Sequence, residues 1–595
     1  MKRSVFNWSF VVCVIWFPVF YIIFSLFFTV VVSSIYFFDS FNLLNNIFGS
    51  VLFLFVSSAL CCLLFYRVEN LPYHAPGTRA YGATVIAVGL IFFVFVGSIR
   101  LIYGVGTPFA PMLMHAGLLH HDIVFRLSIS SILSENALIT AGVNGYVNTI
   151  SPSLFEVSLG GLSAFLGSNP VDVFYAYFSG FVPAIWLLLL VAIPIILGAP
   201  VLLAAWAPVA IATISLFSLT VEVPYWGMKP FINAPYAFAL MFLLLQVFVL
   251  VRLALASKAY KETDMPFGTA AKFCALMVIV ATLATASKIQ VGFVTSAGAC
   301  IAILILPMKL VHRLALLTVC SVLLALAGFY AIYFSLEFVG GLEIIVKWKL
   351  LALHAGVALL LVLFMVSDRD PSVKWLSLPL TVMLLAALVT PTLYASGNQE
   401  TFFHNQALWI SVPVIVGIAS NRGLLQSRMT LKIALAAVVL INALTIFELA
   451  DNNALKTRMD RSLQRIASSL QASDPTLTQT LNAVQQAANQ IDGDLNVGLF
   501  IPHENKEFWA LGYSCIFPNF YLQANTGMAL LVGNRPITER CPNPIAGYQS
   551  IPQNLTPPYT PDALCPIARS RSVDAVILVN DIDRLPLDVI DCRGS

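Results

Sequence analysis

The chain has 595 residues, of which 59% are hydrophobic and only 10% are charged, and its mean hydropathy is +0.87. A soluble globular protein carries about 25% charged residues, so this composition indicates a membrane protein. The net charge of +3 is too small to suggest a nucleic-acid partner. The length allows a large helical bundle plus one soluble domain.

The first apolar run follows Met1-Lys2-Arg3 and continues to about Phe38. We interpret it as a retained span, because it is too long for a signal peptide and has no small-residue cleavage pattern. About thirteen runs in all are long enough, or nearly long enough, to cross a bilayer. They lie near residues 10–37, 47–66, 80–104, 172–196, 199–219, 236–256, 270–286, 294–308, 314–336, 350–366, 375–395, 408–420 and 433–447.

The positions of Lys and Arg predict which loops face the cytoplasm. With the N-terminus inside, the inner segments hold 15 Lys and Arg residues, and the outer segments before the tail hold 6. Positive charge accumulates in cytoplasmic loops, so this orientation is favoured. The loop at 105–170 follows the third span and the tail follows the last one, so both are expected outside. We expect an integral protein of a bacterial inner (plasma) membrane.

The tail has the pattern of a small soluble domain. A stripe of Leu477, Leu481 and Val484 predicts an amphipathic helix. Short apolar runs at 495–501, 528–532 and 575–579 predict buried strands. Four cysteines suggest two disulfides of open connectivity if the tail is in an oxidising compartment; they are Cys515, Cys541, Cys565 and Cys592.

The sequence therefore predicts a mostly α protein of two domains. Residues 1–447 would form a polytopic transmembrane bundle that carries the outer loop 105–170, and residues 448–595 an extracytoplasmic α/β domain.

The outer loop contains a cluster of ionisable residues, His120-His121-Asp122. Apolar residues at roughly helical spacing predict an interfacial helix lying on the bundle. A carboxylate pressed against apolar surface there would have a raised pKa, so Asp122 could act as a general base. A purely structural alternative is an ion pair between Asp122 and Arg126, one helical turn further on.

The same three residues could instead bind a divalent metal ion, because imidazole and carboxylate suit several such ions. Adjacent residues on a helix point about 100° apart, so the three cannot all face one ion there. A metal site would need a loop conformation or help from further ligands, for which the candidates are Glu135, Glu222 and His404.

At this point the loop resembles that of a known family. The segments His121-Asp122 through Phe125-Arg126-Leu127, Asn144-Gly145-Tyr146, Ser151-Pro152-Ser153 and Leu162 are similar to the first large outer loop of polytopic glycosyltransferases with the GT-C fold. In that family the loop usually follows the first span, whereas here it follows the third. The resemblance implies a polyprenyl-phosphate sugar as donor and an acidic loop residue that activates the acceptor or binds a metal.

Other outer segments supply further candidates for substrate contacts. Lys288 joins the seventh and eighth spans and would either snorkel to the headgroups or contact a lipid-linked phosphate. Lys347 and Lys349 could also help to hold a phosphate. Tyr225 and Trp226 could form an aromatic belt or a platform for a sugar ring; the polar contacts beside such a sugar would be Glu222, Lys229 and His404.

The leading functional hypothesis is glycosyl transfer from a polyprenyl-phosphate sugar to a glycan or lipid acceptor at the outer face of the membrane. Asp122 would deprotonate the acceptor hydroxyl with inversion at the anomeric carbon, His120 and His121 would position Asp122 or a metal, and Lys288 would steady the leaving phosphate. Two alternatives remain: a transporter or flippase of lipid-linked saccharide, and a non-catalytic assembly protein of cell-envelope polysaccharide.

Overall fold

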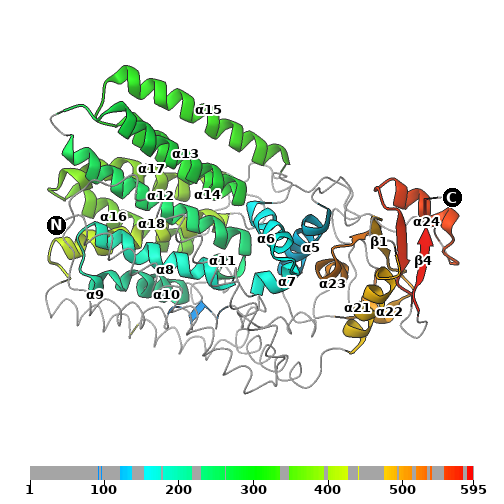
Figure 1. Ribbon diagram of the computed structural model, residues 1–595. Helices are drawn as coiled ribbons and strands as arrows, with labels where there is room; N and C mark the ends of the chain where they lie inside the picture. Colours follow the sequence, from blue (N-terminus) through cyan, green and yellow to red (C-terminus); the bar gives the residue numbers. More distant parts are fainter. Residues whose placement is uncertain are drawn as a thin grey trace. The chain divides into compact units, whose positions relative to one another are not determined.

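The structure is a computed structural model, and its contacts divide the chain into two compact units (Figure 1). Unit 1 comprises residues 1–99, 180–333 and 337–457, and unit 2 comprises residues 100–179, 334–336 and 458–595. The residues that the structure describes are 92, 95–96, 99, 121–136, 153–175, 179–217, 229–260, 263–334, 348–393, 400–425, 440, 475–491, 495–511, 517–532, 536–538, 555, 557–580 and 586–593.

Unit 1 is a bundle of apolar helices, and each apolar run predicted between residues 172 and 420 corresponds to helix. The runs are too long for single strands and carry few charges, so their main-chain hydrogen bonds are satisfied within each helix. The helices are α8 Ser179–Ile196, α9 Val201–Ala204, α10 Trp206–Phe217, α11 Lys229–Ile232, α12 Ala234–Ala259, α13 Phe267–Ser287, α14 Ile289–Leu304, α15 Leu310–Phe334, α16 Trp348–Val366, α17 Pro371–Leu393 and α18 Glu400–Asn421.

Five helices of the described residues are long and apolar enough to cross a bilayer: α12, α13, α15, α17 and α18. Their environments differ, because α12 and α18 have 83% and 94% of their apolar windows buried, against 11% for α15. The first two are therefore interior helices, and α15 presents an exposed apolar surface of the kind that faces lipid. The predicted runs near 10–37, 47–66, 80–104 and 433–447 lie wholly or almost wholly outside the described residues.

Ion pairs join several helix ends at one end of the bundle, which we call the Asp368 end. Arg422 after α18 lies 2.7 Å from Asp368, and Lys258 near the end of α12 lies 2.9 Å from Asp370. The charge distribution predicts all of these segments on the cytoplasmic side, and their contacts agree with a common side. The joint between α13 and α14 and the start of α18 lie at the opposite end.

Unit 2 combines helices of the outer loop with the tail. The loop contributes α5 His121–Asn136, α6 Leu154–Leu166 and α7 Pro170–Val173, and α5 packs against both α6 and tail helix α23, Phe517–Thr526. Ser131 donates a hydrogen bond of 2.6 Å to the main-chain oxygen of Ala524, and the rings of Phe125 and Phe520 lie 5.0 Å apart. The loop and the tail must therefore lie on the same side of the membrane.

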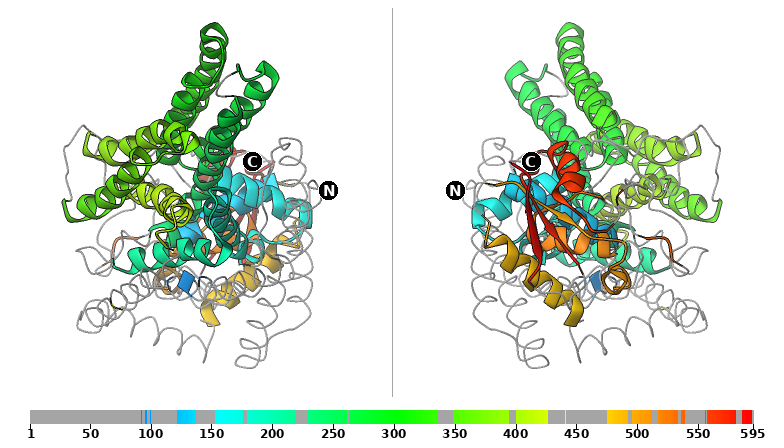
Figure 2. Two further views of the ribbon diagram at one scale, coloured as in Figure 1. Left: turned by 90° about the vertical axis from the view of Figure 1, so that its left-hand side faces the viewer. Right: turned by 90° about the vertical axis from the view of Figure 1, so that its right-hand side faces the viewer.

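The tail contains a small mixed sheet with helices on both faces. Its order is β2-β1-β3-β4, with β1 parallel to β2 and β3, and β3 antiparallel to β4. Helix α24 packs on one face and α21 on the other, as the right-hand view of Figure 2 shows. The elements are α21 Pro475–Ala488, β1 Val497–Phe500, α22 Lys506–Trp509, α23, β2 Ala529–Leu530, α24 Pro561–Arg569, β3 Ala575–Leu578 and β4 Asp588–Asp591.

The three predicted strands and the predicted helix from residue 477 onward are confirmed. Their apolar side chains are largely buried, as the sequence pattern predicts. Leu477 and Val484 are fully buried on α21, and Leu499 and Ile577 are fully buried in the sheet. The sequence reading missed β4, which is an edge strand with one buried residue, Ile590, between exposed neighbours.

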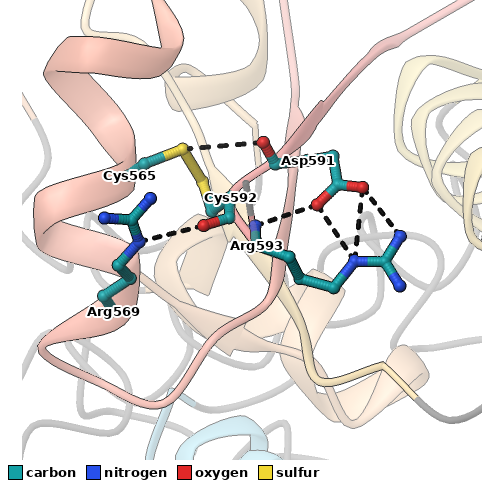
Figure 3. The surroundings of a disulfide bond; sticks show 5 residues. All are labelled: Cys565, Arg569, Asp591, Cys592 and Arg593. Atoms are coloured by element: carbon teal, nitrogen blue, oxygen red, sulfur yellow. Dashed lines mark hydrogen bonds and ion pairs between the residues drawn. A yellow bond between two sulfur atoms is a disulfide. The ribbon is translucent and has the colours of Figure 1, made fainter. Parts of the chain in front are cut away.

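One disulfide is present among the described tail residues. Cys565 of α24 is bonded to Cys592 just after β4, which confirms that this pair of the four cysteines is oxidised (Figure 3). Arg569 donates a hydrogen bond of 2.9 Å to the main-chain oxygen of Cys592 beside the bridge. Cys515 and Cys541 lie outside the described residues. A disulfide in this position is typical of a tail that faces an oxidising compartment.

Candidate functional site in the membrane bundle

Lys288 is the single residue between two membrane helices, α13 and α14. Its main-chain N–H donates to Ala284 at the end of α13, and its main-chain oxygen accepts from Val291 and Gly292 in the first turn of α14. Lys288 itself is extended, with φ −159° and ψ 114°. It thus ends one helix and begins the next, so Lys288 lies at the tip of the helical hairpin that α13 and α14 form.

Close packing of the two helices depends on Gly292. A Cβ atom at this position would overlap both the main chain and the side chain of Thr285 on α13. Thr285 is itself held by a hydrogen bond of 2.7 Å to the main-chain oxygen of Ala281. The absence of a side chain at Gly292 therefore allows the tight hairpin that carries Lys288 into the bundle.

The Lys288 side chain lies inside the protein. Only 6% of it is exposed, and its Nζ atom lies 4.6 Å from the ring centroid of Phe402 on α18. A cation over an aromatic face is attracted by the ring quadrupole, and more so where water is excluded. This position differs from the snorkelling alternative, in which the ammonium group would reach out to the headgroups along the lipid-facing surface.

Hydrogen bonds around Phe402 hold the neighbouring helices together. Its main-chain oxygen accepts from the hydroxyl of Tyr236 on α12 and from Nε2 of Gln406, each at 2.8 Å. Gln406 also donates to the main-chain oxygen of Gln290 at 3.2 Å, so it links α18 to α14. We call Tyr236, Lys288, Gln290, Phe402 and Gln406 the Lys288 cluster.

The Lys288 cluster contains a buried amide oxygen, on Gln406, that is not satisfied within the described residues. Gln406 is fully buried, and its Oε1 atom has no hydrogen-bond partner there. A buried amide oxygen without a partner costs about 1–3 kcal/mol, so its retention in an apolar bundle is informative. The cluster therefore combines a buried cation with an acceptor that a hydroxyl-bearing ligand would satisfy.

Two buried histidines occupy the other side of α18. The rings of His354 on α16 and His404 on α18 are stacked, with centroids 6.3 Å apart, and the residues are 1% and 2% exposed. Residues two apart on a helix lie about 200° around its axis, so His404 faces away from Phe402 and toward α16. Lys288 and His404 thus share one end of the bundle but flank α18 on different sides.

The predicted acidic site begins helix α5 in unit 2. His121 and Asp122 are its first two residues, which confirms a helix at this position, and its packing partners in unit 2 are α6, α7 and α23. The side chains of both residues and all of His120 lie outside the described residues. Arg126 forms an ion pair of 2.7 Å with Glu156 of α6, a residue with no exposed surface.

Glu156 was not identified from the sequence as a partner of Arg126. It also accepts a hydrogen bond from the hydroxyl of Ser153. The spacing Ser153-x-x-Glu156 marks the start of α6, but Ser153 makes no side-chain cap hydrogen bond, and this spacing gave no signal for Arg126 as the partner of Glu156. The ion pair ties α5 to α6 and so fixes the direction of α5, the helix that begins at His121.

Most other predicted contact residues lie outside the described part of the chain, namely Glu222, Tyr225, Trp226 and Lys347. Lys229 begins α11 and Lys349 is the second residue of α16, but their side chains are not described. Among the residues that the structure describes, no group of three or more His, Cys, Asp or Glu side chains is arranged to hold a metal ion.

Sequence reading also missed His354 and Gln406. The available signal was a polar residue inside an apolar run, since His354 lies within the predicted span 350–366 and Gln406 just precedes the run at 408–420. Such residues are rare in spans and usually face the bundle interior, which is where both lie.

These features define a polytopic integral membrane protein with a buried polar cluster at one end of its helix bundle. No protein-family model and no curated protein sequence matches the chain. The class of protein therefore follows from the helices and the site alone.

Proposed function

We propose that this protein is a membrane glycosyltransferase, which takes a sugar from a polyprenyl-phosphate donor and transfers it to a glycan or lipid acceptor on the extracytoplasmic face. The observation that carries the proposal is the burial of Lys288 beside Phe402, at the end of the bundle that the charge distribution predicts outside. A buried ammonium group can bind an anion strongly because water is excluded around it, and a lipid-linked phosphate is an anion available at that depth.

In the proposed reaction, an acceptor hydroxyl attacks the anomeric carbon while the bond from that carbon to the phosphate oxygen breaks. The electron pair leaves with the phosphate, which departs as polyprenyl phosphate, and its growing negative charge is stabilised by the Lys288 ammonium group. Asp122 is proposed from sequence alone as the base that takes the hydroxyl proton. Direct displacement of this kind inverts the anomeric configuration.

The test uses the purified full-length protein in lipid nanodiscs and polyprenyl phosphate without a sugar as the probe. Lys288→Met keeps the side-chain volume and removes the charge, and we expect it to weaken binding at least tenfold, because a charge-assisted hydrogen bond contributes about 1.5–3 kcal/mol. Lys288→Arg keeps the charge and should retain most of the affinity. Lys309→Ala is the matched control, since Lys309 is an exposed lysine at the Asp368 end.

Equal binding by Lys288→Met and the wild type would remove Lys288 from the site. For the chemistry, the wild type should release polyprenyl phosphate when it is given a polyprenyl-phosphate sugar and an acceptor, and Asp122→Asn should abolish that release. Full turnover by Asp122→Asn would exclude Asp122 as the base.

One observation favours transport of a lipid-linked saccharide as a second candidate. Gln246 lies near the middle of α12, is fully buried, and has no hydrogen-bond partner for either amide atom within the described residues. The buried hydroxyl of Ser411 on α18 also has no hydrogen-bond partner within the described residues. Polar groups inside a bundle can line a substrate path. Movement of labelled lipid-linked saccharide across proteoliposomes, without release of polyprenyl phosphate, would favour the transporter.

A further inference from the structure

The small sheet of the tail has a topological switch point between β1 and β3. From β1 the chain crosses to β2 on one side, and it then returns to form β3 on the other side of β1. The helices that follow β1 and β2 consequently diverge to opposite faces of the sheet. In open α/β sheets, ligands bind outside the carboxyl ends of the strands at such a point.

Polar side chains gather at this carboxyl edge. The register pairs Phe500, the last residue of β1, with Leu578, the last residue of β3, and pairs Leu578 with Asp588, the first residue of β4. Glu504 follows β1 and Asn580 follows β3. The residues that we call the sheet-edge cluster are Glu504, Asn505, Tyr559, Asn580 and Asp588.

Asn505 holds the two loops of this edge together. Its Nδ2 atom donates to the main-chain oxygens of Val579 and Asn580, at 3.1 and 3.0 Å, and its Oδ1 atom accepts from the main-chain N–H of Phe508. The Nδ2 bonds thus bridge the loop after β1 and the loop after β3, and the Oδ1 bond caps α22 and holds the Asn505 side chain in place. The edge is therefore a fixed platform rather than two independent loops.

Each carboxylate at the edge is oriented by one neighbour and remains exposed. The hydroxyl of Tyr559 donates to Glu504 at 2.6 Å, and the side-chain amide of Asn580 donates to Asp588 at 3.2 Å. Burial and the bond to Glu504 raise the pKa of Tyr559, so its hydroxyl stays protonated as a donor. A carboxylate has about four acceptor positions, and one bond leaves the others available to a ligand.

These features select the chemistry of the ligand. Two exposed carboxylates disfavour phosphates and other anions, and they favour a ligand that donates many hydrogen bonds. Tyr559 packs against the hydrophobic core, with its ring centroid 5.0 Å from that of Phe500, and because it is only half-buried, part of it remains accessible beside Glu504. Hydroxyl groups around an apolar ring face are the chemistry of a neutral sugar.

We propose that the sheet-edge cluster is a binding site for a neutral glycan, with Glu504 and Asp588 accepting hydrogen bonds from sugar hydroxyls and Tyr559 packing against a sugar ring. The site lies entirely within the tail and does not depend on the proposed transferase activity.

The experiment applies the full-length protein in nanodiscs to an array of neutral and acidic oligosaccharides, and then measures the affinity for each retained glycan by calorimetry. The wild type should retain at least one neutral glycan. Glu504→Gln and Asp588→Asn should each weaken its binding about tenfold, since each removes a charge-assisted acceptor. Glu507→Gln is the control, because Glu507 is an exposed acid on α22 outside the cluster.

Thermal unfolding of each variant establishes that it is folded, and Tyr559→Phe supplies a second test because it removes only the hydroxyl that orients Glu504. Retention of no neutral glycan, or equal affinity in all variants, would overturn the proposal. So would binding of calcium ions alone, lost in both acidic variants, which would assign the edge to a cation. Lys288→Met should leave glycan binding unchanged, so failure of this proposal is distinguishable from failure of the proposed transferase activity.

Discussion

Removal of the Cys565–Cys592 disulfide should lower the free energy of unfolding of the tail by an amount that follows from the length of the loop it closes. The bridge closes a loop with a sequence separation of 27 residues. In the chain-entropy treatment, a loop of this length restricts the unfolded chain by about 3.5 kcal/mol. Both residues are only 1% exposed, so Cys565→Ala/Cys592→Ala avoids buried free thiols. The double variant should lose about that free energy in the stability of the tail.

Hydrogen exchange measured by mass spectrometry on the full-length protein is the assay. The main-chain N–H groups of β1 and β3 exchange only when the sheet opens, so their rates report the opening equilibrium. A loss of about 3.5 kcal/mol corresponds to roughly 400-fold faster exchange. Exchange in α12 should not change. Contacts such as the hydrogen bond from Arg569 to the main-chain oxygen of Cys592 involve no sulfur and should persist.

A change of less than about threefold in β3 would refute this reasoning. That result would mean that the hydrophobic core between α24 and the sheet, rather than the restriction of the unfolded chain, determines the stability of the tail.

Two further predictions concern unit 2. Glu156→Gln should destabilise the α5–α6 pair by about 2 kcal/mol, because it removes the negative charge that Glu156 places beside the partly buried guanidinium of Arg126. Hydrogen exchange of α5 should then accelerate roughly 30-fold, and an unchanged rate would contradict the role of the ion pair. Burial raises the pKa of Asp172 on α7 above its ordinary value. The folded state therefore binds the proton more tightly than the unfolded state, and stability declines as the pH rises from the pKa of the unfolded state through that of the folded state. Asp172→Asn should therefore raise the melting temperature at pH 7 and have less effect near pH 4, and a larger gain at the acidic pH would show the sign to be wrong.

The sequence predicts those helices and strands whose structure is determined by the length and hydrophobicity of a single continuous run of residues. The apolar run near 236–256 had to be helix, because a span of that length satisfies its main-chain hydrogen bonds only within itself, and α12 confirms it. The run 575–579 is short, β-branched and bounded by polar residues, and it forms β3. Edge strand β4 lacked such a signal, since only Ile590 of its residues is buried.

The candidate site could be predicted only in part, because its contacts join distant residues. The sequence singled out Lys288 by its charge at the end of an apolar run, but nothing local indicates Phe402, 114 residues later, as its partner. The ion pair of Arg126 with Glu156 is similar: spacing suggested Asp122, one turn away and with a side chain outside the described residues, but nothing local indicated Glu156 on another helix. Helical periodicity determines which face a residue occupies but not which helix covers that face.

The contact between α5 and α23 determines an order of events during synthesis. Ser131 and its partner Ala524 are 393 residues apart. At about 5–20 residues per second, roughly 20–80 seconds pass between the synthesis of the two. Residues of α5 that are buried in the folded protein, such as Leu127 and Ile132, therefore cannot be covered by α23 until the last part of the chain has been synthesised. The bundle helices enter the membrane during that time. Unit 2 is completed last, so a chain that stops short of α23 carries an uncovered apolar helix, and exposed apolar surface of this kind is a signal on which quality control can act.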